Sequence, residues 1–391
     1  MNPSVNPERA ALRKSVAEFV RREIAPNLQE WEDAGEIPRD LHRRAAEQGL
    51  LGIAFGEDVG GEGGDLADSV ALQEAFFEAG ASSGLMAGLF THGIALPHLA
   101  ASGNVDLVDR FVRPTLAGEL IGALAITEPG GGSDVAGIRT TAELIMGSDG
   151  DSHYLVNGSK TFITSGVRAD FVTTAVRTGG PSRSGQGHAG VSLLVVEKGT
   201  PGFTVDRSLA KMGWHCSDTA ELSYVDVRVP VANLVGEEGS GFYAIAAQFV
   251  VERIALAVHA YGIAARSLAL TAAYCRERET FGQPLITNQV VQHKLVEMHR
   301  RVEVARAYTH AVVARHLAGE SVIAEAALAN QTAVEASSLV CDQAVQLHGG
   351  TGYMHGTEVE RHYRDARILP IGGGATEVLT DLAAKLLGYT A

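Results

Sequence analysis

The sequence TEPGGGSD occupies Thr127–Asp134, at the point where the pattern of the chain changes. It follows a short apolar stretch that predicts a strand, and it offers hydroxyl groups, backbone N–H groups and a run of glycines. Such a run lets a flat or phosphorylated ligand come close to the backbone. Taken alone, the segment is also compatible with an ordinary long loop, so its surroundings decide its meaning.

The chain before this segment has the periodicity of helices. From Glu8 to about Leu124 apolar residues recur at three- and four-residue spacing, as in Val16, Phe19 and Val20. Glycine-rich stretches separate these helices as loops. The first third is therefore predicted to be all-α.

The chain after the segment has the pattern of strands. Up to about Val235, short runs rich in Val, Ile, Thr and Phe alternate with turn residues. Asn157-Gly158 predicts a two-residue hairpin, because both residues tolerate positive φ. The region is expected to form a compact β-barrel or sandwich. Its clearest strands are His153–Val156, Phe171–Arg177, Val191–Glu197 and Leu222–Val229.

Helical periodicity returns after Gly241 and continues to Arg278, a helix of about 55 Å at the rise of an α-helix. Two long helices, Gln289–Ala318 and Ile323–Leu347, and a shorter one from Ala375 are expected to follow. The sequence thus predicts an α+β multidomain protein. Its parts are an all-α N-terminal domain (1–122), a central β-barrel domain (123–237) and a C-terminal four-helix-bundle domain (238–391).

Composition excludes several classes of protein. The chain has 391 residues, 46% of them hydrophobic, and a formal net charge of -14. Such acidity disfavours nucleic acid as a partner, because that affinity depends on Lys and Arg neutralising phosphates. No signal peptide and no uninterrupted apolar run of about 18 residues are seen, so we expect a cytoplasmic protein without membrane insertion. The three cysteines are widely spaced and predict neither disulfides nor a zinc site.

Several short motifs point away from other chemistries. Gly185-x-Gly187-x-x-Gly190 matches the dinucleotide pattern but leads into a strand, so it is interpreted as a hairpin loop. His348, His355 and His362 are evenly spaced, yet no HExxH or Cys/His ligand set is present, and no metal is expected. Neither a GxxxxGK[ST] loop nor a GxSxG elbow occurs. Redox chemistry on an organic cofactor remains.

Further motifs follow Thr127–Asp134 in a fixed order along the chain. Together these segments resemble the signatures of the acyl-CoA dehydrogenase family, which has the same α, β, α order, and the resemblance covers nearly the whole chain. The segments are Asn157–Thr164 (NGSKTFIT), Lys211–Thr219 (KMGWHCSDT), Arg278–Gly282 (RETFG), Gln289, Gln346–Tyr353 (QLHGGTGY) and Arg364–Ile368 (RDARI).

The resemblance implies a particular catalytic base. In medium- and short-chain members of the family the base is a glutamate on the loop after the RDA motif, but the matching residue here is Gly373. In long-chain and isovaleryl members it is a glutamate before an arginine on the long helix of the C-terminal domain, which here is Glu252-Arg253. Glu252 is therefore the expected base. It lies in an apolar stretch, where a buried carboxylate costs free energy and is better explained by a function than by packing. Gly373 would still donate its N–H to the substrate, and Arg253 would shape the substrate site.

The resemblance also implies residues that bind FAD. Thr127 and Thr164 would contact the isoalloxazine ring and Phe162 would pack beside it, although many relatives have tryptophan there and threonine in place of Ala375. Ser133 would lie near the phosphates of CoA. Arg278, Phe281, Gln289, Gln346, Gly349 and Gly350 match positions that bind the FAD of a neighbouring subunit, so at least a dimer is required. The remaining family contacts are Leu124, Gly132, Thr376 and Glu377 for the cofactor and Gly374 for the substrate.

The activity implied is FAD-dependent α,β-dehydrogenation of a fatty acyl-CoA. By resemblance we expect a long or branched acyl chain, a homotetramer and electron-transfer flavoprotein as the electron acceptor. One alternative is an acyl-CoA oxidase or flavin monooxygenase of the same fold. Another is an inactive acyl-CoA-binding partner subunit.

Overall fold

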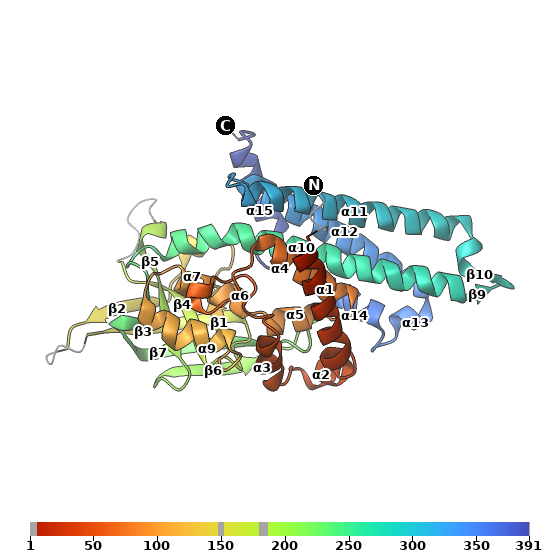
Figure 1. The fold of residues 1–391 in the computed structure, drawn as a ribbon. Helices are drawn as coiled ribbons and strands as arrows, with labels where there is room; N and C mark the ends of the chain where they lie inside the picture. Colours follow the sequence, from red (N-terminus) through yellow and green to blue (C-terminus); the bar gives the residue numbers. More distant parts are fainter. Residues whose placement is uncertain (1–5, 148–151, 180–186, 391) are drawn as a thin grey trace.

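The computed structural model describes residues 6–147, 152–179 and 187–390. Helices make up the N-terminal third, strands follow, and long helices end the chain (Figure 1). The predicted fold class, helical and β parts in the order α, β, α, is confirmed.

The N-terminal helices begin at side-chain caps that the sequence supplies. Asn6 accepts the N–H of Glu8 before α1, whose first residue is Pro7, and Asp65 and Asp68 form a capping box at α4. Each cap satisfies backbone donors that the first helical turn leaves free. The helices are α1 (Pro7–Phe19), α2 (Leu28–Ala34), α3 (Asp40–Glu47), α4 (Leu66–Glu78), α5 (Ser83–Leu89), α6 (His92–Ala95), α7 (Pro97–Ala100), α8 (Val105–Leu107) and α9 (Arg113–Leu116).

The strands β1 to β8 form one eight-stranded sheet within the described residues, along the path β6-β7-β3-β2-β4-β5-β8, and β1 pairs in parallel with β4. Valine, leucine, alanine and two tyrosines fill most of one face, and β4 and β5 also bury their other face against N-terminal helices. The strands are β1 (Gly122–Ala125), β2 (Thr141–Ile145), β3 (His153–Thr164), β4 (Phe171–Arg177), β5 (Val191–Glu197), β6 (Phe203–Ser208), β7 (Thr219–Pro230) and β8 (Leu234–Val235).

The predicted hairpin at Asn157-Gly158 is wrong. Strand β3 continues through both residues and pairs with β7 on either side, with a register shift between Val156 and Gly158. Gly158 has φ +152°, and Asn157 exchanges hydrogen bonds with Asp226 across the strands. A bulge and a hairpin both use a residue with positive φ, so the dipeptide alone does not distinguish them. Of the Gly185–Gly190 motif, Gly187–Gly190 forms a short 3-10 turn before β5, whereas Gly185 lies outside the described residues.

Helix α10 spans Gly241–Glu277, and three later helices pack against it: α11 (Gln289–Leu317), α12 (Ile323–His348) and α14 (Glu358–Ala366). Helix α12 contacts α10, α11 and α15. The elements after α10 are β9 (Glu279–Thr280), β10 (Gln283–Pro284), α11 (Gln289–Leu317), α12 (Ile323–His348), α13 (Gly350–Tyr353), α14 (Glu358–Ala366) and α15 (Thr376–Leu386).

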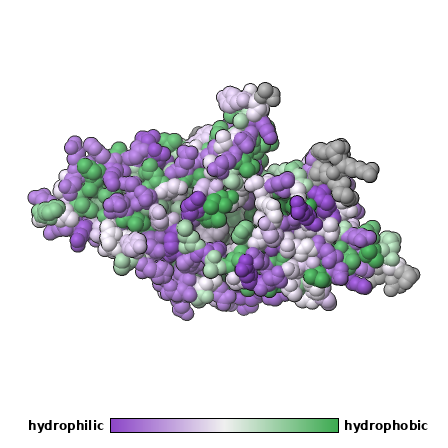
Figure 2. Space-filling view, turned by 180° about the vertical axis from the view of Figure 1, so that it is seen from behind, coloured by the Kyte–Doolittle hydropathy of each residue, from purple (hydrophilic) through white to green (hydrophobic). Residues whose placement is uncertain are grey.

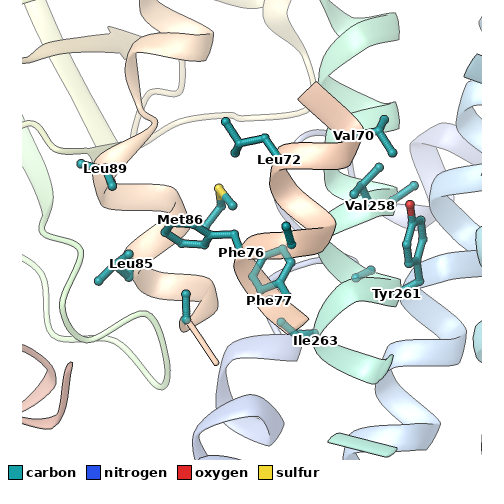
Figure 3. Close-up of a cluster of buried hydrophobic side chains, with 14 of the residues drawn as sticks. Val70, Leu72, Phe76, Phe77, Leu85, Met86, Leu89, Val258, Tyr261 and Ile263 are labelled. Atoms are coloured by element: carbon teal, nitrogen blue, oxygen red, sulfur yellow. The ribbon is translucent and has the colours of Figure 1, made fainter. Parts of the chain in front are cut away.

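The main core joins the N-terminal helices to α10. Phe76 and Phe77 of α4 pack between α5 and the Val258–Ile263 stretch of α10 (Figure 3). A Cβ on Gly262 would lie 2.5 Å from the ring of Phe77, so α4 can approach α10 closely only at a glycine. This packing therefore sets the distance between α4 and α10.

Helix α10 also has a window of 18 residues with mean hydropathy 1.5, long and apolar enough to cross a membrane, of which 33% is buried. Its contacts with α4, α11 and α12 are those of a core helix.

Apolar side chains lie among polar ones on the face shown in Figure 2. Exposed apolar residues on the C-terminal part include Phe281, Val290, Val296 and Tyr353.

Candidate active site

Glu252 lies on α10 and is partly buried. Burial raises the pKa of this carboxyl to about 7, because removal of water penalises the charged form, and the neighbouring Arg253 opposes that rise only in part. A carboxyl with such a pKa exchanges a proton near neutral pH. This is the property that a general base needs.

The loop between α14 and α15 brings Gly373 beside Glu252, although the two are far apart in sequence. Gly373 has φ +71°, and a Cβ on it would lie 3.6 Å from Oε1 of Glu252. The same Cβ would lie 2.2 Å from Cδ1 of Leu256, one turn after Glu252 on α10. The structure thus places the two candidate base positions at one point.

The N–H of Gly373 has no acceptor within the described part of the chain. Other N–H groups of the loop are bonded: Ile371 and Gly372 donate to the carbonyl of Ile368, at 2.9 and 2.8 Å, and Thr376 donates to the carbonyl of Pro370 at 3.2 Å. A free donor next to a carboxyl with a raised pKa can stabilise an oxyanion near the base. Gly374 follows with φ +111°, and its N–H also lacks an acceptor among these residues.

Arg253 is buried, with its guanidinium 5.2 Å from the centre of the Phe249 ring. Its Nε has no hydrogen-bond partner in the described structure, and burial lowers the pKa of the group. A buried cation with an unused donor is costly unless a ligand uses it. The position is compatible with the predicted role in the substrate site.

The segment Thr127–Asp134 and strand β3 are joined by the backbone and by a buried ion pair. The N–H of Thr161 donates to the carbonyl of Thr127 at 2.9 Å. The Lys160 ammonium, 0% exposed, donates to the Glu128 carboxylate and to the carbonyl of Ile126, each at 2.9 Å. Glu128 also accepts the N–H groups of Arg139 and Thr140. Thr127 and the end of β3 are therefore held together.

The end of β3 is strained where the flavin contacts were predicted. Phe162 and Ser165 have φ of 61° and 60°, in the left-handed region that side chains disfavour, and Thr164 lies between them. Ser165 is held by a 2.6 Å hydrogen bond between its hydroxyl and that of Thr91. Such outliers concentrate at functional sites. Phe162 is exposed and Thr164 partly buried.

The other residues of Thr127–Asp134 that are predicted to contact ligands are exposed to solvent. Gly132 and Ser133 are exposed, and a Cβ on Gly130 or Gly131 would meet no atom within 4 Å. Leu124 is partly buried on β1. On α15, Thr376 is partly buried and Glu377 is exposed. Within the described ranges, no group of three or more His, Cys, Asp or Glu side chains lies close enough together to hold a metal ion.

A second group of predicted residues lies at the opposite end of α10. Arg278 follows that helix, about 39 Å from Glu252 at the rise of an α-helix, near β9 and β10 (Figure 1). Phe281 is fully exposed with φ 53°. The structure does not bring this group to Glu252 within one chain. Its other members, all exposed, are Gln289, Gln346, Gly349 and Gly350.

Sequence reasoning missed three features of the site: the contact of Leu256 with the Gly373 loop, the Lys160–Glu128 pair, and the Thr91–Ser165 hydrogen bond. None of the three contacts is visible in the sequence, because each joins residues far apart along the chain.

Comparison with known proteins gives matches over the whole chain. Models of the N-terminal, middle and C-terminal domains of acyl-CoA dehydrogenases match residues 6–119, 123–227 and 239–388. The mitochondrial long-chain specific acyl-CoA dehydrogenase of Rattus norvegicus is 39% identical over 379 residues, which cover 97% of this chain and 86% of that protein.

Solved structures are also similar throughout. A structure from Mycobacterium smegmatis assigned to the acyl-CoA dehydrogenases is 61% identical, with a TM-score of 0.95 and 99% of both chains covered. The FAD complex of PigA is 25% identical, with a TM-score of 0.91 and 98% of both chains covered.

Proposed function

Because the chain belongs to the acyl-CoA dehydrogenase family, a family of flavin-dependent oxidoreductases, we propose that it oxidises the Cα–Cβ bond of a fatty acyl-CoA, with FAD as cofactor and Glu252 as base. The observation that carries the assignment of the base is the convergence of Glu252 and Gly373 at one point, together with a carboxyl pKa of about 7.

The residues of the chain divide the work as follows. The Glu252 carboxylate takes the proton from the α carbon, and its pKa near the working pH suits it to both accept and release that proton. The free N–H of Gly373 donates to the thioester carbonyl oxygen, where negative charge develops. Arg253 adds a positive charge beside the same carboxylate. The chemistry that bound FAD would supply is acceptance of the hydride from the β carbon.

The described residues fit FAD in two places. Around Thr127, the glycine run is open to a close approach, and the strained end of β3 presents Phe162. These residues would hold the ring, as the resemblance implies. At the far end of α10, exposed Arg278 offers a charge for a pyrophosphate, and Gly349 has φ 59° beside an open Gly350.

Assembly follows from the separation of these two places. Arg278 lies about 39 Å from Glu252 along α10, and strands β1, which precedes Thr127, and β3, which carries Phe162, lie by the other end of that helix (Figure 1). We therefore propose that a second subunit supplies Arg278 and its neighbours. A homotetramer, containing such dimers, is the proposed assembly. The exposed apolar side chains of the helical part, Phe281 and Val290 among them, are compatible with burial between subunits.

Arg278→Ala is expected to weaken FAD retention while the folded chain persists, because the change removes a charge-assisted contact but no buried side chain. Flavin absorbance per subunit after gel filtration measures it, with sedimentation for the assembly. Arg276→Ala, which changes another exposed arginine two residues earlier, is the matched control and should keep its flavin. Full FAD retention by Arg278→Ala, or a flavin-loaded monomer, would contradict the interface.

The electron acceptor is proposed to be electron-transfer flavoprotein, on the strength of the family resemblance. An oxidase or monooxygenase of this fold would instead use oxygen. Mixing the reduced enzyme with air in a stopped-flow instrument separates the two, since a dehydrogenase should reoxidise slowly. A purified protein without flavin absorbance would favour the inactive partner subunit.

The substrate is proposed to be longer than butyryl-CoA, or branched, because a base on α10 resembles the arrangement in long-chain and isovaleryl relatives. Turnover of an acyl-CoA panel with an artificial electron acceptor should give its highest kcat/KM on a longer or branched substrate, since that ratio measures discrimination. A maximum on butyryl-CoA would overturn the assignment.

A further inference from the structure

Leu256 lies next to the candidate base on α10. It follows Glu252 by one helical turn and is therefore on the same face of the helix. Its Cδ1 lies 2.2 Å, and Oε1 of Glu252 3.6 Å, from the point where a Cβ on Gly373 would stand. Leu256 thus fills the space that a side chain at residue 373 would occupy. It is also one of the side chains packed against the main core.

We propose that Leu256 is a positioning residue that, together with the Gly373 loop, limits the access of water to the Glu252 carboxyl. This inference rests on the proposed role of Glu252. Gly373 at φ +71° suits only a glycine well, and Leu256 occupies the space of a side chain there, so both residues lie close to the carboxyl. An apolar cover of this kind raises the cost of the charged form.

Few charged groups compete with this effect. Among the residues that the structure describes, Arg253 is the charged neighbour that acts on the pKa of Glu252, and it lowers that pKa. The loop 370–374 has no ionisable side chain. Helix α12 contributes the amide of Asn330, which donates to the Arg253 carbonyl at 3.3 Å. On α4, Glu74 is paired with Arg13 and His310. On α7, burial lowers the pKa of His98 to about 4, so its ring is neutral near pH 7.

The sign of the expected change follows from the direction of the shift. Burial raises the pKa of Glu252 from 4.5 to about 7. Removing the apolar cover admits water, which stabilises the carboxylate, so the pKa should fall. The acid limb of flavin reduction should then move to lower pH, and the limiting rate should fall because a weaker base accepts the α proton less readily.

The test is an infrared pH titration of the holoenzyme, with the Glu252→Gln variant subtracted to isolate the Glu252 carboxyl. The wild type should titrate near pH 7, and Leu256→Ala at least about one unit lower. Leu256→Asn, which keeps the size but brings polarity, should shift in the same direction if the alanine variant folds poorly. Leu256→Val should stay close to the wild type, as should Leu268→Ala, a matched leucine further along α10.

These variants distinguish a failure of the role of Leu256 from a failure of Glu252 as the base. If folded, flavin-loaded Leu256→Ala and Leu256→Asn both titrate where the wild type does, the role of Leu256 is wrong, whatever the base. If Glu252→Gln retains rapid flavin reduction, the base assignment fails instead, and the infrared titration still reports whether Leu256 governs the carboxyl. The acid limb of flavin reduction, measured for the same variants, should move with the titration.

Discussion

Replacing Glu252 with glutamine should lower kcat by at least about 10²–10⁴-fold, the usual contribution of a positioned base. Glutamine nearly preserves the shape of the side chain, but its amide cannot accept the α proton. FAD content and acyl-CoA binding should remain, because the changed atom lies beside the free N–H of Gly373 and outside the predicted cofactor contacts. Steady-state turnover with an artificial acceptor measures the loss, and binding of acyl-CoA by the same variant separates catalysis from folding.

Two further variants sharpen this result. Glu377→Gln should be far milder, since Glu377 is an exposed residue in the first turn of α15. Moving the base to Gly373→Glu in the Glu252→Gln background should restore part of the activity only when Leu256→Ala is added. The structure sets that condition, because a Cβ at 373 would lie 2.2 Å from Leu256 Cδ1. The left-handed φ of +71° adds strain of about 1–2 kcal/mol, so full rescue is not expected.

The second large effect concerns stability. Lys160→Met should lower the free energy of unfolding by about 3–5 kcal/mol, because it leaves the Glu128 carboxylate buried without its cation. The ammonium is 0% and the carboxylate 10% exposed, so water cannot compensate. Burial lowers the pKa of Lys160 to about 8, and Glu128 opposes that shift. Urea denaturation measures the loss.

The matched control is the double variant Lys160→Met with Glu128→Gln. Removing both charges should recover much of the stability lost by Lys160→Met, since breaking a buried pair costs more than replacing it. FAD retention should fall in Lys160→Met, because the pair holds Thr127 against the end of β3. A loss below about 1 kcal/mol in the single variant, the value of an exposed pair, would mean that the contact is unimportant.

The long elements could be predicted closely from the sequence. Helix α10 was expected from Gly241 to Arg278 and ends at Glu277, and strands β4 and β5 have the predicted bounds. Long periodic stretches carry this information locally. The hairpin at Asn157-Gly158 failed because the local preference for positive φ serves a bulge equally well, and pairing with β7 decides between them. The proposed domain limits at residues 122 and 237 stay predictions.

The site could be predicted only in part. Glu252 was found because it precedes an arginine in an apolar stretch, in a chain that resembles a family with its base there. That Gly373 lies near both Glu252 and Leu256 depends on how the loop after α14 packs on α10, which no local pattern encodes. The same holds for Lys160: its position within β3 is visible in the sequence, but its partner Glu128 is not. The roles of the individual residues toward FAD stay predictions.

The central claim, that Glu252 removes the α proton of an acyl-CoA during flavin reduction, is tested most directly by single-turnover mixing without oxygen. Holoenzyme is mixed with an excess of a long-chain acyl-CoA, and the loss of flavin absorbance is followed for wild type, Glu252→Gln and Glu377→Gln. The account predicts rapid bleaching in the wild type and Glu377→Gln, and bleaching slowed by at least about 10²-fold in Glu252→Gln. Near-normal flavin reduction in Glu252→Gln would contradict it and would place the base on Glu377 or on another acid.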